Sequence, residues 1–404
     1  MTQGPDILGS DDRPSFFPIG NAADIGLSAP EDRLGQPVRT WVRALAGMQK
    51  EAFVANGANG SAWRLVSDEG PYLDGHDRAP CPLCTFIAGM SSSYMNEILA
   101  IAEQRGLDIA DIELTLGNFY SMEGSALRGT MLGGAMNPKL EVEIVADADT
   151  ADLDDLVQQA IYASPINGLI RGVSNSLFTL SWNGDQIPVG EVGSLGGEVE
   201  PDPAEKFVEV SIADLPVADD LMIMVKPADQ VEGVPGGAGS SLQESQSRTL
   251  HVQARCRIRE DGLKVVHENL YRPIGSEFQF LSDEAPSGGG HGRAPDAITY
   301  LAAGVGFCFM TQFGRYASIT KKQLDEYRIV QDIHFSHGGG SGATGEHGSA
   351  DPVETHVYLV TPEGEEFARK TLDMGERTCF LHATCRTDLD VDVTVDHVKE
   401  VVRS

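Results

Sequence analysis

The stretch ITYLAAGVGFCFMTQF, residues 298–313, is apolar along nearly its whole length and carries a single cysteine, Cys308, near its middle. A run of this length and composition predicts a helix that is buried on all sides rather than one that lies on the surface. We therefore expect a core helix that places a thiol inside the protein.

The same design occurs earlier in the chain, at positions 215 lower. The sequence HGRAP at 291–295 corresponds to HDRAP at 76–80, and Ala303-Gly304 corresponds to Ala88-Gly89 (304 − 89 = 215). This spacing holds without a gap from the loop before the helix to the strands after it, which chance similarity would not produce. The sequence therefore predicts a tandem duplication.

The two copies differ at their thiols. Cys308 corresponds to Ser93, and Cys379 corresponds to Ser164 (308 − 93 = 379 − 164 = 215). One copy thus carries two thiols where the other carries two hydroxyls. Six cysteines in 404 residues are too few for a disulfide scaffold. These thiols need either a chemical explanation or a packing one.

The charge of the chain excludes two classes of partner. Sixty acidic residues against thirty basic ones give a formal charge of −30, and no Lys/Arg cluster interrupts this negative field. Such a surface repels phosphate backbones and anionic lipids, so we expect neither a nucleic-acid partner nor a membrane partner.

The compartment is predicted from targeting signals and cysteine use. The N-terminal sequence lacks the basic start and apolar core of a secretory signal. The apolar runs are interrupted before they reach the ~18 apolar residues of a membrane span. We expect an acidic, cytoplasmic protein, in which thiols stay reduced unless they are catalytic or metal-bound.

The length predicts two or three domains, and the repeat favours two. We expect an N-terminal tail at 1–36, a first repeat at 37–190, an insert with a Gly/Ser-rich linker at 191–248, and a second repeat at 249–404. Each repeat has the pattern of an antiparallel meander, a long buried helix, strands, a second helix and a final strand. Because strands and helices are segregated along the chain, the predicted fold class is α+β.

Hydrophobic periodicity locates the elements within this plan. One helix is expected to open at Pro80 and Pro82 and to run to about 105, and another is expected from 149 to about 162. Strands are expected at 110–120, 139–146, 327–335, 355–361 and 390–395. In the insert, residues 206–227 suggest an apolar hairpin, and for the tail we assign no structure.

The central helix and the second cysteine together resemble a known family. Ala294-Pro295 precedes the helix, Leu301 and Cys308 lie along it, and Cys379 opens a second helix further along the chain. This pattern resembles that of the OsmC/Ohr family, the osmotically inducible protein C and organic hydroperoxide resistance proteins. The resemblance implies an intertwined dimer with two central helices side by side and thiol sites at the subunit boundary. A tandem chain would build this arrangement as a pseudo-dimer within one polypeptide, with a degenerate first repeat.

The resemblance also implies a chemistry. Cys308 would be the peroxidatic thiolate that attacks the O–O bond of an organic hydroperoxide and becomes a sulfenic acid. Cys379 would be the resolving thiol that condenses with it to a disulfide, which a dithiol reductant then reopens. The family stabilises the thiolate with an arginine from the first hairpin, and Arg259 is the nearest candidate, displaced by one position.

One feature of the family is missing. A glutamate near the start of the central helix holds the arginine in the family, but this position falls on Thr299, and on Cys84 in the first repeat. Arg293, Arg315 or a histidine could supply the positive charge instead.

A second pair of thiols lies at the start of the 82–105 helix. Cys81 and Cys84 form a C-x-x-C pair at a helix N-terminus, where the helix dipole lowers thiol pKa values. The pair could reduce the Cys308 site, form one half of a metal site, or merely pack at the helix start. Because the chain has no second C-x-x-C, we assign no metal site.

Four histidines lie in the repeat that keeps its cysteines, whereas their counterparts in the first repeat are not histidines. The histidines and their counterparts are His334 and Phe119, His337 and Met122, His347 and Leu132, and His382 and Asn167. His334 and His382 are accessory candidates for acid–base chemistry near Cys308. Histidines in such positions are also common structural residues.

The function predicted from the sequence is thiol-dependent reduction of organic hydroperoxides or related electrophiles, as part of a stress response. It needs a dithiol reductant as partner and no cofactor. Two alternatives stay open: a Cys/His-dependent hydrolase, lyase or sulfur-transfer enzyme on a specialised metabolite, and a non-catalytic protein of the same fold that binds a small ligand. Two tandem chains could also associate as a homodimer.

Overall fold

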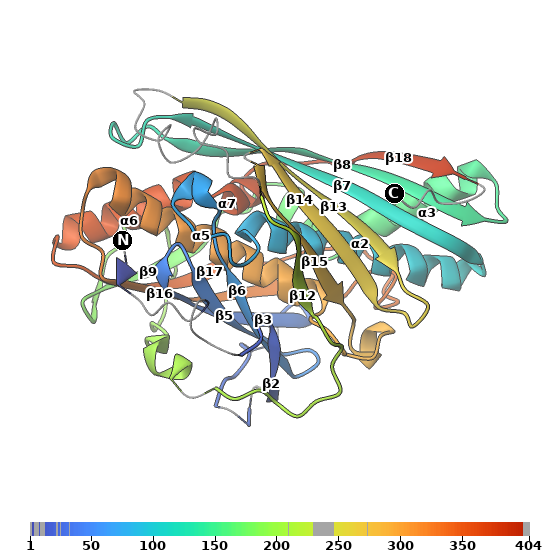
Figure 1. The fold of residues 1–404 in the computed structure, drawn as a ribbon, viewed down its shortest axis with the longest axis horizontal. Coiled ribbons are helices and arrows are strands. Elements are labelled where there is room, and N and C mark those ends of the chain that lie inside the picture. The colour runs from blue at the N-terminus through green and yellow to red at the C-terminus, as the bar shows by residue number, and fades with distance from the viewer. Residues whose placement is uncertain are drawn as a thin grey trace.

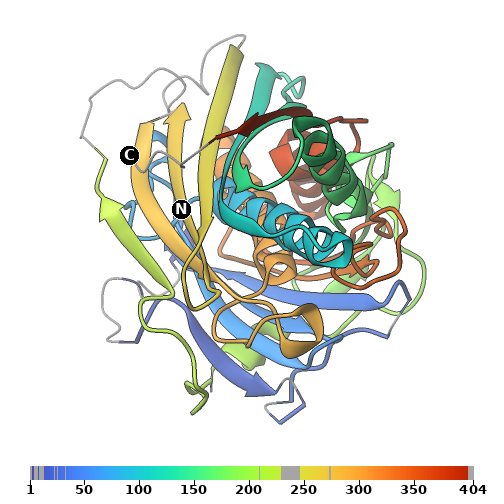
Figure 2. The same ribbon diagram turned by 90° about the vertical axis from the view of Figure 1, so that its right-hand side faces the viewer.

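The computed structural model describes residues 2–3, 8, 13–21, 23–24, 26–31, 33–208, 210–228, 246–272 and 274–398. Two long helices lie side by side between two β-sheets, as Figures 1 and 2 show. Both sheets contain parallel as well as antiparallel pairs, and the fold belongs to the predicted α+β class. Most of the predicted Gly/Ser-rich linker, at 229–245, lies outside the described residues.

The two central helices are α2 (Pro82–Arg105) and α5 (Ala297–Thr320). They cross at a pair of glycines. A Cβ atom at Gly89 would lie 2.6 Å from the carbonyl oxygen of Ala297, and one at Gly304 would lie 2.7 Å from the Cβ atom of Phe86. The two backbones can approach this closely only because neither position carries a side chain.

Helix α5 is the buried helix that the run at 298–313 predicts. It is long and apolar enough to cross a membrane by length and composition alone, but 94% of the 18-residue window that meets this criterion is buried inside the protein. It contacts β3, β5 and β16, whereas α2 contacts β7, β13 and β14. Each central helix therefore packs on a different sheet.

The first sheet has nine strands. Along the sheet its order is β10 (Asp185–Ile187), β9 (Leu177–Trp182), β17 (Glu354–Val360), β16 (Glu326–Phe335), β3 (Gln36–Ala44), β5 (Lys50–Asn56), β6 (Ser61–Ser67) and β2 (Phe17–Asn21), with β11 (Gly193–Ser194) beside β9. The predicted meander forms its β3, β5 and β6 portion.

The second sheet has seven strands. Its order is β12 (Met222–Lys226), β15 (Ile274–Ser282), β14 (Lys264–Arg272), β13 (Gln246–Ile258), β7 (Ile109–Gly124), β8 (Leu132–Ala146) and β18 (Asp392–His397). A separate two-stranded sheet joins β1 (Thr2–Gln3) to β4 (Ala46–Gly47).

The shorter helices lie around these elements. They are α3 (Thr150–Ala163), α4 (Asn167–Ile170), α6 (Glu365–Thr378) and α7 (Phe380–Cys385), with 3-10 turns η1 (Pro71–Leu73), η2 (Pro203–Phe207) and η4 (Pro286–Gly288). Several bounds recur at the same distance along the chain: α2 and α5, α3 and α6, η1 and η4, and β9 and β18 (297 − 82 = 365 − 150 = 286 − 71 = 392 − 177 = 215).

Each sheet combines strands from two parts of the chain. We call β3 to β10 (residues 36–187) the first segment and β13 to β18 (residues 246–397) the second segment. β3 pairs with β16 in one sheet, and β13 pairs with β7 in the other. The two segments are therefore interleaved, and each sheet needs both.

The predicted hairpin in the insert is wrong for the residues that the structure describes, 206–208 and 210–227. Residues 206 and 207 belong to the 3-10 turn η2 instead of a strand. Strand β12 pairs with β15 at the edge of the second sheet rather than with a neighbour inside the insert. The ring of Phe207 stacks on that of Phe53 at 4.6 Å. The apolar residues of the insert pack on surfaces that the rest of the fold supplies, which local periodicity cannot anticipate.

Part of the predicted tail packs on the body of the protein. Strand β2 pairs with β6 at the edge of the first sheet. Phe16, Phe17 and Ile19 are buried. A strand of five residues between Pro- and Gly-rich stretches gives too weak a periodic signal to be predicted from sequence.

The helix crossing can be tested by adding a methyl group to it. Gly89→Ala should lower the free energy of unfolding by about 1–3 kcal/mol, because the new Cβ meets backbone atoms of α5 that cannot move aside. Chemical denaturation of the purified variant measures this loss. Gly196→Ala, where a Cβ would meet open space, is the control and should stay within about 0.5 kcal/mol of the parent. Equal stabilities of the two variants would contradict the close crossing.

Candidate active site

The structure brings Cys308 and Cys379 together. Their sulfur atoms lie 3.3 Å apart, and their residues are 2% and 0% exposed. Cys308 lies in α5, while Cys379 joins the end of α6 to the start of α7 in an extended conformation. A disulfide needs a sulfur–sulfur distance of about 2.05 Å, so a small movement would allow the bond to form. Burial, followed by the neighbouring Cys308, raises the pKa of Cys379.

An equivalent pair of hydroxyls lies in the first segment. The Oγ atoms of Ser93 and Ser164 lie 2.7 Å apart, and both side chains are buried. Ser93 belongs to α2, and Ser164 caps the end of α3, as Cys379 caps the end of α6. The same backbone arrangement thus holds two thiols in one place and two hydroxyls in the other.

Two buried cations lie close to Cys308. Lys50 begins β5, is 1% exposed and donates to the carbonyl oxygen of Met48 at 2.5 Å. Burial lowers its pKa, while Glu69, Asp68 and the Cys308 thiol act in the opposite direction. A nearby positive charge favours the thiolate form of a cysteine.

The second cation is Arg315, which lies on α5 two turns after Cys308. Burial lowers the pKa of its guanidinium, and the charges of Glu69 and Cys308 oppose this effect. Its Nη1 atom donates to the side chain of Gln312 at 3.2 Å, and Thr378 of α6 donates to the same oxygen at 3.3 Å. These bonds tie the cationic part of α5 to the end of the helix that precedes Cys379.

The carboxylate of Glu69 connects the two segments beside the thiols. It follows β6 in the first segment and accepts a hydrogen bond from Thr311 of α5 at 2.9 Å. The hydroxyl of Tyr72 donates to its other oxygen at 2.9 Å. Thr311 lies one helical turn after Cys308, so Glu69 fixes the first segment at the thiol site.

Comparison with known protein families identifies the part of the chain that contains the two thiols. Residues 290–394 match the family model described as OsmC-like protein. The chain contains an OsmC-like domain. The match begins before α5 and ends in β18, so it includes both Cys308 and Cys379. No curated protein matches the chain.

Arg259, the predicted cation, lies outside the matched OsmC-like domain and is not brought to the thiols. It is half exposed in the turn between β13 and β14, where its Nη2 atom donates to Asp261 at 3.0 Å. Arg293 lies nearby, with its side chain bonded to Asp283 at 2.8 Å and to the carbonyl oxygen of Asp261 at 2.9 Å. Both arginines order this loop.

Arg259 is not beside the thiols because the first hairpin of each segment packs against the central helix of the other segment. Lys264, which begins β14, donates to Asn96 of α2 at 2.6 Å, and Asn96 donates to Glu284 at 2.6 Å. Asn96 lies one turn after Ser93. The second segment therefore supplies charge to the hydroxyl pair, and the first segment supplies Lys50 and Glu69 to the thiols of the OsmC-like domain.

A signal for Glu69 was present in the sequence. Ser67-Asp68-Glu69 and Ser282-Asp283-Glu284 occupy corresponding positions, which marks both glutamates as part of the shared design. Thr299, at the position of the missing family glutamate, is buried, and its backbone N–H donates to Asp296 at 2.7 Å. Lys50 corresponds in the structure to Lys264, because they pair with Ser67 and Ser282, but a one-residue shift in the hairpin (264 − 50 = 214) hides this match from the 215-residue spacing.

The two candidate histidines differ in their surroundings. The ring nitrogens of His334 lie 2.8 Å from Arg33 Nη2 and 2.8 Å from the carbonyl oxygen of Glu31, so this residue holds the N-terminal segment. His382 of α7 is buried against the ring of Phe309 at 4.6 Å. Burial lowers its pKa to about 3, and neither ring nitrogen has a hydrogen-bond partner among the described residues.

The other four cysteines are buried. Cys81 and Cys84 lie at the start of α2 with their sulfur atoms 2.8 Å apart. Burial raises the pKa values of Cys256 and Cys385 to about 12 each. Across the part of the chain that the structure describes, no three or more His, Cys, Asp or Glu side chains are grouped to hold a metal ion.

A buried carboxyl group lies beside Cys84. Glu268 of β14 is buried, and within the described ranges neither of its oxygens has a hydrogen-bond partner. Burial raises its pKa to about 8, and Asp77 and Glu277 add to this effect while Cys84 opposes it. At neutral pH the carboxyl group is therefore largely protonated.

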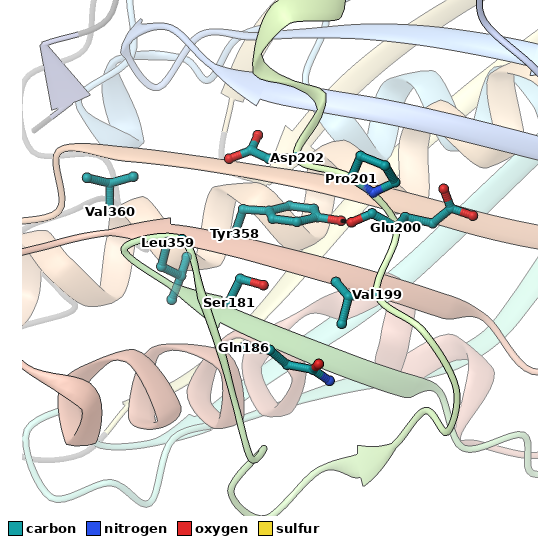
Figure 3. Close-up of a pocket in the computed structure, with 10 residues that line it drawn as sticks. Ser181, Gln186, Val199, Glu200, Pro201, Asp202, Tyr358, Leu359 and Val360 are labelled. Carbon is teal, nitrogen blue, oxygen red and sulfur yellow. Dashed lines mark hydrogen bonds between the residues drawn. The ribbon is translucent and has the colours of Figure 1, made fainter.

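Two surface pockets formed by described residues lie away from the thiols. Figure 3 shows one between β17 and residues 199–202, where the hydroxyl of Tyr358 donates to the carbonyl oxygen of Glu200. Its lining includes none of the candidate site residues. A second pocket is lined by Arg259 and its neighbours in the β13–β14 turn.

Replacing the buried lysine tests the electrostatics of the thiol site. Lys50→Met should slow the alkylation of Cys308 by iodoacetamide at neutral pH by about three- to tenfold, because it removes a positive charge that favours the thiolate. Peptide mass spectrometry over time measures the rate. Lys264→Met, at the hydroxyl pair, is the matched control and should alkylate Cys308 at the parental rate. An unchanged rate in a folded Lys50→Met protein would show that Lys50 does not act on this thiol.

The buried carboxyl predicts a pH dependence of stability. The folded pKa of Glu268 lies above its unfolded value, so as pH rises from about 4.5 to 8 the unfolded state loses the proton first and the fold is progressively destabilised. Glu268→Gln removes this pH-dependent loss of unfolding free energy, which is about 1.4 kcal/mol for each unit by which folding raises the pKa. Its Tm relative to the parent should therefore increase with pH over this range. Glu260→Gln, in an exposed turn, should show a flat difference, and a flat difference for Glu268→Gln would refute the raised pKa.

Proposed function

We propose that the chain is a tandem OsmC-like protein that reduces organic hydroperoxides or related electrophiles through Cys308 and Cys379. The observation that carries this proposal is the 3.3 Å separation of the two thiols, beside the buried cations Lys50 and Arg315. Two thiols within reach of a disulfide, one of them close to buried cations, are the minimum that a two-cysteine peroxidase needs.

The tandem and pseudo-dimeric part of the proposal is supported by the exchange between segments. Helices α2 and α5 have bounds that differ by 215 residues, and each approaches the other through a glycine at the same place. The parallel strand pairs also correspond, since Leu177 pairs with Glu354 and Lys139 pairs with Asp392 (354 − 139 = 392 − 177 = 215). Two copies that swap hairpins in this way would complete each other's sites.

The reaction proceeds in two steps. The thiolate of Cys308 attacks one oxygen of the hydroperoxide, the O–O bond breaks, and the other oxygen leaves with its organic group as an alcohol after it takes up a proton. Cys308 is now a sulfenic acid. The sulfur of Cys379 attacks Cys308, water leaves, and a disulfide forms that a dithiol later reduces.

The surroundings of the thiols support an organic rather than an ionic substrate. Tyr120 and Phe380 face each other beside the pair with ring centroids 5.5 Å apart, and Tyr120 is close enough to both thiols for their charges to raise its pKa further, after burial. Apolar rings favour the organic group of a substrate, while Lys50 and Arg315 act on the sulfur. Reaction in this buried site would exclude competing water.

His382 favours a second candidate function. Its ring nitrogens have no partner within the described residues, and it lies three residues after Cys379 on α7. A neutral imidazole beside a thiol pair could exchange protons with a bound substrate. This arrangement would suit a Cys/His-dependent hydrolase or lyase.

The decisive experiment is oxidation of the fully reduced chain with one equivalent of cumene hydroperoxide. The intact mass should fall by two hydrogen atoms, and peptide mapping shortly after mixing should find Cys308 joined to Cys379. Cys308→Ser should abolish this linkage, and Cys379→Ser should stop at a sulfenic acid that dimedone traps. Cys385→Ser, a buried thiol on α7, is the control.

Two results would argue against the peroxidase. One is that both thiols remain free after prolonged exposure to the hydroperoxide. The other is that Cys385→Ser blocks the reaction as completely as Cys308→Ser does. In either case the Cys/His alternative becomes the stronger one, and His382→Asn becomes the next variant to examine.

A further inference from the structure

The two central helices begin in chemically different ways. Helix α5 begins after Asp296, whose side chain accepts a hydrogen bond from the backbone N–H of Thr299 at 2.7 Å. At the matching positions of α2 stand Cys81 and Cys84, and Cys81 makes no side-chain capping bond. A capping residue contributes about 1 kcal/mol, so α2 lacks a stabilising contact that α5 has.

Besides Cys81 and Cys84, a third residue near the start of α2 differs from its counterpart in the other segment. Glu268 pairs with Phe278 as Val54 of the first segment pairs with Trp63 (278 − 63 = 215), so it stands where the first segment has a valine. Its carboxyl lies beside Cys84. A buried acid replaces an apolar side chain, and two thiols replace the aspartate and threonine that form the cap of α5. All three replacements suit dithiol chemistry.

The geometry of Cys81 and Cys84 fits a disulfide. Their sulfur atoms lie 2.8 Å apart on the first turn of a 24-residue helix. Burial raises the pKa of both thiols, but that of Cys84 more strongly. Cys81 is therefore the easier thiolate, and Cys84 needs a proton acceptor. Glu268 can accept that proton only in its ionised form, which is the minor form at neutral pH because burial raises its pKa to about 8.

Hydrogen bonds connect this pair to the Cys308 site. The hydroxyl of Ser67 donates to the carbonyl oxygen of Pro80 at 2.8 Å, which fixes the residue directly before Cys81. Two residues after Ser67, Glu69 accepts from Thr311 at 2.9 Å, one turn from Cys308. The loop that holds Cys81 is thus also the loop that contacts the thiol helix.

Shared neighbours indicate the same proximity. The amino group of Lys50 interacts electrostatically with both Cys308 and Cys81. The phenol of Tyr120 interacts with Cys308, Cys81 and Cys379. The two thiol pairs therefore border one buried cluster.

We propose that Cys81 and Cys84, with Glu268 as proton acceptor and donor, form a second dithiol–disulfide couple that reduces the Cys308–Cys379 disulfide. This inference rests on the proposed function, which supplies that disulfide. It makes the C-x-x-C pair the entry point for electrons from an external dithiol.

The transfer is a thiol–disulfide exchange in two steps. The Cys81 thiolate attacks the sulfur of Cys308, the Cys308–Cys379 bond breaks, and Cys379 leaves as a thiolate that takes up a proton. Cys84 then gives its proton to Glu268 and attacks Cys81, which breaks the mixed disulfide and releases the Cys308 thiolate. Two electrons have moved from the Cys81/Cys84 pair to the Cys308/Cys379 pair.

The different exposures of the cysteines explain why an external dithiol would need such a relay. Cys379 is fully buried and Cys308 nearly so, whereas Cys81 is 7% exposed and follows a loop with exposed residues at 74, 76 and 78. A small hydroperoxide needs only a narrow path to Cys308, but a dithiol reductant must bring a thiolate into line with the disulfide. Of these four buried cysteine residues, Cys81 has the largest exposed fraction.

The test follows the disulfides over time in the full chain. The reduced protein receives one equivalent of cumene hydroperoxide, samples are quenched with acid and N-ethylmaleimide, and linked peptides are mapped. The Cys308–Cys379 linkage should form first and then be replaced by Cys81–Cys84. In Cys84→Ser, a mixed disulfide between Cys81 and Cys308 should accumulate. Cys256→Ser, a buried thiol of β13, is the control and should follow the parental order.

Two outcomes of the time course overturn the relay while leaving the peroxidase intact. In one, the Cys308–Cys379 disulfide forms and persists while Cys81 and Cys84 are fully alkylated. In the other, Cys84→Ser gives no mixed disulfide although Cys308–Cys379 forms normally.

A redox titration covers the case in which the peroxide gives no disulfide at all, which would refute the proposed function. The protein is oxidised with diamide and equilibrated in dithiothreitol buffers of increasing reducing strength. The relay requires the Cys308–Cys379 disulfide to be reduced before Cys81–Cys84, because electrons must flow toward the first pair. The opposite order, or a Cys81/Cys84 pair that stays reduced in every buffer, would overturn the relay independently.

Discussion

The close crossing of α2 and α5 is the constraint on which the rest of the structure depends. Because Gly89 and Gly304 have only a hydrogen atom as side chain, the two helix backbones can come into contact. Ser93 and Cys308 each lie one helical turn beyond these glycines, so the crossing fixes where both side chains lie. The two sheets then pack on the outer sides of the helix pair, and each sheet can close only with strands from both segments.

This interleaving explains how charge comes to lie beside a buried thiol. An isolated charge in the core would be strongly unfavourable, but Lys50 and Glu69 enter together, and Glu69 is held by Thr311 and Tyr72. Both charged residues belong to the first segment, whereas Cys308 belongs to the second. The site therefore exists only when the two segments are assembled, and neither could maintain its electrostatics alone.

The two ends of the helix pair have the same backbone arrangement but carry chemically different side chains. One end has two thiols with a lysine, a glutamate and a threonine, and the other has two hydroxyls with a lysine, a glutamate and an asparagine. Two hydroxyls cannot form a disulfide, so of these two pairs only Cys308 and Cys379 could carry thiol–disulfide chemistry. The start of α2 adds a further pair of thiols and a buried acid that the start of α5 lacks.

The sequence by itself determined the α+β class and the approximate positions of both central helices, because hydrophobic periodicity is a local signal. The pairing of Cys308 with Cys379 was implied only by the family resemblance. The sequence did not reveal that β12 joins β15, or that Lys50 rather than Arg259 approaches the thiol. These features depend on which hairpin packs on which helix. Only the tertiary structure decides that, because residues far apart in the chain become neighbours through burial of shared apolar surface, which no local pattern records.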